Sequence, residues 1–173
     1  SNELDANHPI FGRRMVNISE EAIRVLSKVP SFEGLEEDIL KAIASIAIRR
    51  SYRAGQIVFL EGEPSSGLYV VENGWLKSVK ISTTGREQVI RFVGPNEVFN
   101  DLGVFSDGPN RVTVETLEDA SVWIIEKESL LQMIERYPKL SQMIIKNLSH
   151  RVLHLMRLVE DLSLRSVQSR LAR

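Results

Sequence analysis

The feature that most constrains the fold is a series of short β-type segments between residues 49 and 125. Each is rich in β-branched or aromatic residues, as in LYVV, QVIRFV and SVWII. Turn residues separate these segments at short intervals, and Asn73-Gly74 between two apolar runs predicts a β-hairpin. Many short strands at this spacing predict an antiparallel sandwich, jelly roll or barrel.

Helical patterns precede this β region. Ser19 before Glu20 and Glu21 is a typical N-cap followed by acids in the first turn, and Pro30 predicts the end of that helix. Apolar residues then recur at helical spacing between residues 35 and 46, which predicts a second, amphipathic helix. The chain is therefore expected to begin with two short helices.

A second helical zone follows the β region. Residues 127–136 predict one short helix, and from Pro138 a helical pattern continues to about Leu164. The fold class is therefore α+β. We expect three parts, namely an arm and helix at 1–30, a β domain at 31–137, and a long helix with its tail at 138–173.

The long helix carries a regular apolar seam with β-branched residues at a positions and leucine at d positions. Its members are Ile145, Leu148, Val152, Leu155, Val159 and Leu162. This pattern favours a parallel two-stranded coiled coil, so we expect a homodimer. The alternative is that the stripe packs on the chain's own β domain. Apolar residues beside the seam, such as Leu153 and Leu158, allow both contacts.

Composition excludes several kinds of site. The chain has 173 residues, a formal net charge of -1 and no cysteine. A near-neutral charge argues against DNA binding by this chain alone. The absence of thiols excludes disulfides, thiolate zinc sites and iron–sulfur clusters. Without a membrane-length apolar run or a signal-peptide pattern, we expect a cytoplasmic protein with no membrane partner.

The histidines do not predict a metal centre. His150 and His154 are four residues apart on the long helix, but no third ligand is near them in sequence, so we interpret them as a solvated face. His8 in the N-terminal arm is the remaining haem candidate. No histidine lies between residues 49 and 125, which argues against a cupin-type enzyme. We predict no catalytic residue.

Several short motifs together resemble the Crp/Fnr family of bacterial transcription regulators over residues 32–173. The motifs are Phe32 with Leu35, Gly55, FLEGE at 59–63, LYVVENG at 68–74, FNDLGVF at 99–105, LED at 117–119, and Ser166-Val167 with Arg170-Leu171-Ala172. The resemblance implies a cyclic-nucleotide-binding jelly roll, a double-stranded β-helix, followed by a dimerisation helix. In the family a winged helix-turn-helix follows, and we expect DNA contact only through such a domain, which these 173 residues lack.

The resemblance places the effector site at residues 100–113. In nucleotide-binding relatives a Gly-Glu pair opens a helical turn that faces the cyclic phosphate, and an arginine pairs with that phosphate. Here Asn100 and Asp101 stand in place of Gly-Glu. Asp101 can still accept a ribose hydroxyl, and asparagine tolerates positive φ. The candidate effector-binding residues are Asn100, Asp101, Leu102, Gly103, Asn110, Arg111 and Thr113.

Two alignments place the family arginine differently. Anchoring on Asn100 and Asp101 puts Arg111 at the phosphate, whereas anchoring on Gly108-Pro109 puts Asn110 there. Because a one-residue shift in a strand turns a side chain to the opposite face, Arg111 either binds phosphate or points to solvent. We favour the second alternative. The effector therefore stays open between cyclic AMP, cyclic GMP and another small molecule.

The long helix bears on the same question. In relatives that bind cyclic AMP, hydroxyl residues of this helix contact the adenine, and the matching residues here are Leu155 and Met156. Apolar side chains cannot replace hydrogen bonds to an adenine edge, although they could line a pocket for another ligand. We prefer the interpretation of Leu155 as a d-position residue of the dimer interface.

Together these features predict the effector-sensing and dimerisation region of a Crp/Fnr-like transcription regulator. A ligand in the jelly-roll pocket would shift the packing of two long helices and, through a hinge at residues 164–166, the DNA-binding domains. The alternative is a stand-alone cyclic-nucleotide-binding module that regulates a protein partner.

Overall fold

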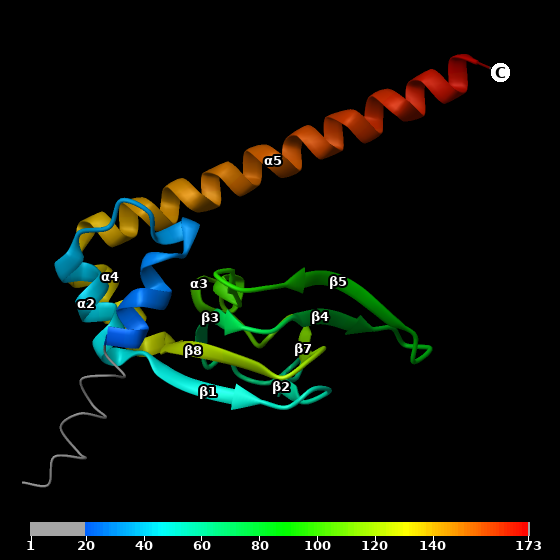
Figure 1. The fold of residues 1–173 in the computed structure, drawn as a ribbon. Coiled ribbons are helices and arrows are strands. Elements are labelled where there is room, and N and C mark those ends of the chain that lie inside the picture. Colours follow the sequence, from blue (N-terminus) through cyan, green and yellow to red (C-terminus); the bar gives the residue numbers. More distant parts are fainter. Residues whose placement is uncertain (1–19, 173) are drawn as a thin grey trace, which may run out of the picture.

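The computed structural model describes residues 20–172, so the N-cap expected at Ser19 and the haem candidate His8 lie outside the described residues. Two four-stranded antiparallel sheets form a β roll, with short helices at one end and a long helix that projects from that end (Figure 1). The predicted α+β fold with an antiparallel jelly roll is confirmed.

The roll consists of eight strands in the described residues. They are β1 (Ile48–Tyr52), β2 (Ile57–Phe59), β3 (Gly67–Asn73), β4 (Leu76–Ile81), β5 (Glu87–Val93), β6 (Val98–Phe99), β7 (Thr113–Thr116) and β8 (Ala120–Glu126). One sheet has the order β1-β8-β3-β6 and the other β2-β7-β4-β5. Except for β4 and β5, neighbouring strands in each sheet are distant in sequence, as in a jelly roll.

The Asn73-Gly74 turn joins the two sheets, so the hairpin predicted there is wrong. β3 pairs with β6 and β8, whereas β4 pairs with β5 and β7. Gly74 has a φ of 83°, and a Cβ atom there would lie 2.5 Å from the carbonyl oxygen of Asp119. The turn signal fixes the local reversal of the chain but not the partner of the next strand. The hairpin is formed by β4 and β5 instead.

Helices precede and follow the strands in the sequence, and one short helix lies between β6 and β7. A helix over residues 20–27 precedes η1 (Pro30–Phe32), α2 (Glu37–Ile46), α3 (Asp101–Phe105), α4 (Lys127–Arg136) and α5 (Pro138–Leu171). The first helix ends before Pro30, which itself begins η1. α5 has 34 residues, continues past the predicted end near Leu164, and is helical through the expected hinge at 164–166.

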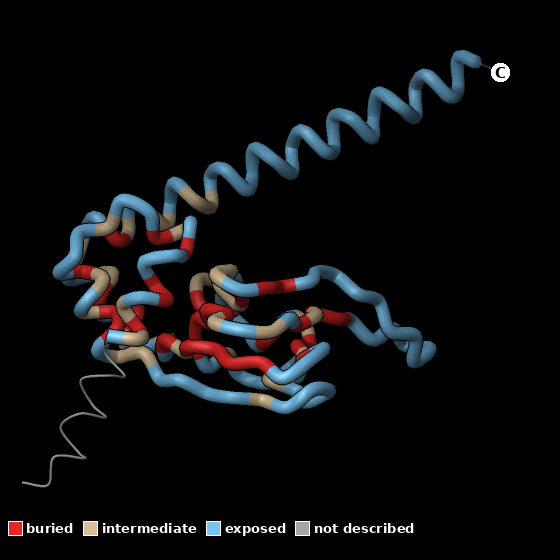
Figure 2. The backbone as a smooth tube through the Cα atoms, viewed as in Figure 1, coloured by how far each residue is buried: buried red, intermediate tan, exposed pale blue. Residues whose placement is uncertain are grey.

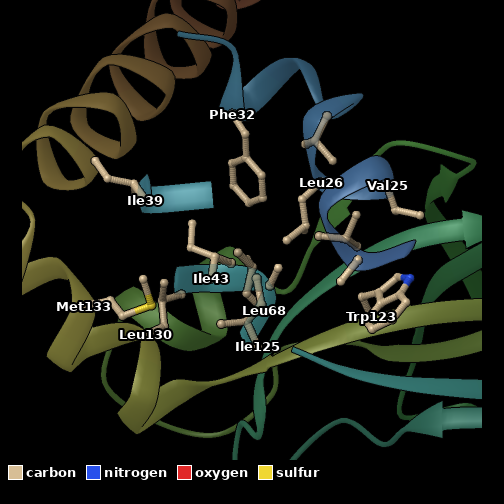
Figure 3. Packing of buried hydrophobic residues seen from close by; sticks show 14 of the residues in the cluster. Val25, Leu26, Phe32, Ile39, Ile43, Leu68, Trp123, Ile125, Leu130 and Met133 are labelled. Carbon is tan, nitrogen blue, oxygen red and sulfur yellow. The ribbon is translucent and has the colours of Figure 1, made fainter. Parts of the chain in front are cut away.

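Two apolar clusters hold the fold together, and β3 belongs to both. Leu68 and Val70 face the helices, where they join a cluster with Trp123 and Ile125 of β8 (Figure 3). Tyr69, from the same strand, faces the other sheet in a second cluster. Because alternate residues of a strand point to opposite faces, a strand buried on both faces is a continuous apolar run, as LYVV is.

α5 buries side chains against the rest of the chain only along its first three turns, and beyond them the Arg151–Asp101 ion pair is its link to the roll within residues 20–172. Leu140 is buried and Met143, Ile144, Asn147 and Leu148 are partly buried, but every residue from 149 to 171 is exposed (Figure 2). Although α5 is long, no helix in residues 20–172 is both long and apolar enough to cross a membrane.

Candidate functional site

The segment predicted to hold the effector forms α3 and the loop after it. Asn100, directly before α3, has a left-handed backbone with a φ of 66°, a conformation that asparagine adopts more readily than most residues. Its side-chain Nδ2 donates to the carbonyl oxygen of Gly67 at 2.8 Å and to Oγ of Ser65 at 3.1 Å. Asn100 therefore fastens α3 to the turn that enters β3.

Gly103 permits this close packing of α3. A Cβ atom at Gly103 would lie 2.5 Å from Oδ1 of Asn100 and 2.8 Å from Oγ of Ser65. The neighbouring Leu102 is 52% exposed and belongs to neither apolar cluster. Within α3, Gly103 thus has a packing role, and Leu102 presents an apolar side chain to solvent.

Asn110 and Thr113 make hydrogen bonds to the turn at residues 60–63. The backbone N–H of Asn110 donates to the carbonyl of Glu63 at 2.8 Å, and its Nδ2 donates to the carbonyl of Leu60 at 3.3 Å. Oγ1 of Thr113 accepts from the N–H of Glu61 at 3.0 Å. Both side chains are buried, and Oδ1 of Asn110 has no hydrogen-bond partner among the described residues.

Arg111 is exposed, whereas its neighbour Asn110 is buried. Within residues 20–172, Arg111 makes no ion pair. The arrangement corresponds to the alignment that puts Asn110, and not Arg111, at the inward position. The candidates therefore divide into packed residues (Asn100, Gly103, Asn110 and Thr113), exposed ones (Leu102 and Arg111) and the partly buried Asp101.

A cleft of about 780 Å³ lies between the β roll and residues 140–158 of α5. Its floor is apolar and includes Phe32, Leu68 and Ile125, which belong to the core at the helical end. The roll contributes Ile90, Arg91, Glu97, Asp101 and Phe105 to its walls, and α5 contributes Ile144, Leu148, Arg151, His154, Leu155 and Leu158. Of the sequence candidates, only Asp101, Leu148 and Leu155 line this cleft.

Two ion pairs stand at the walls of this cleft. The guanidinium of Arg151 on α5 pairs with the carboxylate of Asp101 on α3. The side chain of Arg151 is 48% exposed and that of Asp101 is 20% exposed. On the roll itself, Arg91 pairs with Glu97 at 3.5 Å. Of the two, the first pair joins α5 to the roll, and the sheltered position of Asp101 strengthens it.

Sequence reasoning missed Arg151 and Arg91. Arg151 lies four and seven residues before Leu155 and Leu158, so helical spacing places it on the same face as these apolar residues. The sequence signal for Arg151 is an arginine within an apolar helical stripe. Arg91 lies in a strand whose residues are nearly all exposed, and no local pattern distinguishes it from a solvated side chain.

A separate polar network lies on the outer face of the roll. The side chain of Glu72 is only 6% exposed, and its Oε2 accepts from Nε of Arg49 at 2.7 Å and from Oγ of Ser121 at 2.9 Å. Burial acts to raise the pKa of Glu72, but the hydrogen bonds from Ser121 and Arg49 and the charge of Arg49 hold that pKa below its usual value.

Comparison with known proteins now identifies the domain. The family description "Cyclic nucleotide-binding domain" matches residues 49–137, about half of the chain. The chain belongs to the cyclic nucleotide-binding domain family. The resemblance to Crp/Fnr regulators that the short motifs indicated is therefore confirmed at the level of this domain, whose match includes α3 and the loop that contains Asn110 and Arg111.

Relatives of this cyclic nucleotide-binding domain occur in different proteins. The chain is 26% identical over 149 residues to the CRP-like cAMP-activated global transcriptional regulator of Mycobacterium tuberculosis, covering 86% of this chain and 66% of that protein. It is 27% identical over 124 residues to potassium channel KOR2 of Oryza sativa subsp. japonica, covering 72% of this chain and 17% of the channel.

A solved structure shows the same fold. The catabolite activator protein of Thermus thermophilus superposes with a TM-score of 0.69 at 25% identity, covering 78% of this chain and 63% of that one. The chain thus spans slightly less than two thirds of the regulators that it matches.

Proposed function

We propose that this chain is the effector-sensing and dimerisation region of a DNA-binding transcription regulator, and that its effector binds in the cleft between the roll and α5. The observation that carries the proposal is that this cleft has one wall from the sensor domain and one from α5, joined by the Asp101–Arg151 pair. A ligand there would contact both parts and change their relative packing.

The proposed dimer forms through α5. Five of the six seam residues are between 55% and 67% exposed, namely Ile145, Val152, Leu155, Val159 and Leu162. Burying an apolar side chain of this size contributes about 1.5–3 kcal/mol, so a second copy paired along the seam would supply the burial that α5 lacks. A parallel pair would carry a change at the cleft toward the distal end of both helices.

Cyclic AMP and cyclic GMP are the first effector candidates, because the family is named for cyclic nucleotides and one relative is described as cAMP-activated. Asp101 and Arg151 supply one acceptor and one cation to such a ligand. The proposal assigns the chain no reaction. Within residues 20–172 no group of three or more histidine, cysteine or carboxylate side chains is placed to hold a metal.

A second candidate function is a regulatory module that acts on a protein partner without binding DNA. The similarity to a potassium channel favours it, because there the matching region makes up a small part of a much larger protein. A winged-helix coding sequence directly downstream of residue 173 would decide for the transcription regulator, and its absence from the gene would decide for the module.

The test is calorimetric titration of the full chain with cyclic AMP and cyclic GMP. Arg151→Gln should weaken any binding roughly tenfold, because it removes a charge-assisted contact. Arg157→Gln, on the same helix but outside the cleft lining, is the matched control and should bind like the original chain. Binding that depends on Arg111 and not on Arg151 would contradict the proposed location.

A further inference from the structure

Arg151 pairs with an anion of the chain itself, the carboxylate of Asp101. In the described residues this is the ion pair that joins α5 to the roll, while the other pair made by α5 joins Lys139 to Glu36 beside α2. Asp101 is sheltered and Arg151 about half exposed, so a ligand entering the cleft reaches the guanidinium more easily than the carboxylate.

The walls next to this pair include exposed apolar side chains. On α5, Leu158 is 45% exposed and lies beside the dimer seam, and on the roll Ile90 is 52% exposed. Both line the cleft, and neither side chain can donate or accept a hydrogen bond. A ligand that fills this space gains by burying apolar surface, whereas a polar ring edge placed against these side chains would lose its hydrogen bonds to water.

Several other polar groups of the cleft are already bonded, although the side chains of Ser31, Asn96 and His154, which also line it, make no hydrogen bond within residues 20–172. Arg91 pairs with Glu97, whose second oxygen accepts from the N–H of Gly94 at 2.6 Å. Nδ2 of Asn147 donates to the carbonyl of Ser31 at 2.7 Å. The side chain of Arg151 is 48% exposed and that of Arg91 is 42% exposed, so Arg151, which Asp101 neutralises, is the more accessible of the two arginines in the cleft.

We propose that the effector is an anion with an apolar body, such as an acyl or aryl carboxylate, and that Asp101 occupies the place of its charged group until it binds. The inference rests on the proposed function and names the ligand class of the same cleft. The incoming anion pairs with Arg151 in place of Asp101, and its body fills the space between Ile90 and Leu158. Binding thereby replaces the direct link between α3 and α5 by a link through the ligand.

A competitor of the ligand and an acceptor for a ribose hydroxyl predict opposite effects of Asp101→Ala on ligand binding. If Asp101 competes with the ligand for Arg151, Asp101→Ala removes the competitor and tightens binding. If Asp101 accepts a hydroxyl of a nucleotide, the same change removes a contact and weakens binding. A single substitution at a partly exposed position, where no helix-capping bond is lost, thus separates the two roles.

The experiment titrates the full chain with decanoate and with 1-naphthaleneacetate below any micelle concentration, with decyltrimethylammonium as the charge-reversed control and cyclic AMP in parallel. Decanoate should bind the original chain. Asp101→Ala should tighten this binding by roughly two- to fivefold, in line with a partly exposed ion pair. Arg151→Gln should weaken it roughly tenfold. Asp107→Ala and Arg157→Gln, outside the cleft lining, should leave it unchanged.

The outcomes separate the inference from the proposed function. Decanoate binding that Asp101→Ala weakens or leaves unchanged would overturn the inference, as would equal binding of decyltrimethylammonium. If cyclic AMP binds and Asp101→Ala weakens it, the proposed function stands and the inference fails. If no probe binds, both fail. Circular dichroism and thermal melts of each variant establish that the chain is folded.

Discussion

β3 and the distal half of α5 bury their apolar residues to opposite extents. In β3, Leu68, Tyr69, Val70 and Val71 are each at most 5% exposed, and the chain's own helices and opposite sheet cover them. In α5 every residue from 149 to 171 is exposed, including leucines and valines in a regular seam. An isolated helix gains little stability in water, so the difference supports the proposal that α5 pairs with a second copy while the roll covers its own apolar residues.

The largest expected effect is on the roll, from Trp123→Ala. The Trp123 side chain is fully buried beside the helix over residues 20–27, and its removal should lower the free energy of unfolding by about 3–5 kcal/mol. Urea denaturation at low protein concentration, where α5 is unpaired, measures this loss. Trp75→Ala is the matched control because Trp75 is 46% exposed, and an equal loss there would contradict the assignment of the core.

A change in the seam should weaken dimerisation without changing the stability of the monomer. Val159→Asp places a charge at an a position, and should weaken dimerisation by about 2 kcal/mol or more while leaving monomer unfolding unchanged. Sedimentation equilibrium measures the dimer constant. Leu153→Asp, an exposed apolar residue beside the seam, serves as control. A larger effect at Leu153 than at Val159 would show that a different face of α5 pairs.

The third prediction concerns Glu72 and the pH dependence of the free energy of unfolding. Since the pKa of Glu72 is lowered in the folded state, its charge stabilises the fold above the usual glutamate pKa, and this contribution is lost as pH falls through the lowered pKa. Glu72→Gln should therefore cost about 1–3 kcal/mol at neutral pH and progressively less in acid. Denaturation from pH 7 to pH 3 gives the difference, with Glu118→Gln at an exposed position as the matched control. A gap that widens in acid would refute the linkage.

The smallest expected effect is at Arg111. The side chain is exposed and unpaired among the described residues, so Arg111→Ala should change the free energy of unfolding by less than about 0.5 kcal/mol. It should also leave effector binding unchanged, whereas Arg151→Gln should weaken it. Parallel thermal-shift titrations of the two variants compare them directly, and a reversed order would place the ligand at the loop after α3.

The sequence predicts what depends on local periodicity. The run LYVV and the seam of α5 indicated a strand and a long helix because their patterns repeat over neighbouring residues. The Asn73-Gly74 turn was misread because strand pairing is a non-local choice, made when β4 joined β5 and β7. The division at residues 31 and 138 and the hinge remain predictions.

The candidate site was only partly predictable for the same reason. Asn100 and Asp101 lie at α3 as the motif indicated, and Asn100 has the expected positive φ. The partner of Asp101 is Arg151, fifty residues later in the sequence and on another element, and only the packing of α5 over the roll brings them together. The inward position of Asn110 likewise depends on its bonds to the turn at residues 60–63.

The most direct test is the distance between two spin labels in the dimer. Because the chain has no cysteine, Ser163→Cys introduces one label per subunit near the end of the seam. Parallel helices place the two labels on facing helices about 10 Å apart at the backbone, and the distance should change when an effector occupies the cleft. A backbone separation of about 30 Å would mean antiparallel helices, and the absence of any dipolar coupling would mean a monomer. Either result would contradict the account.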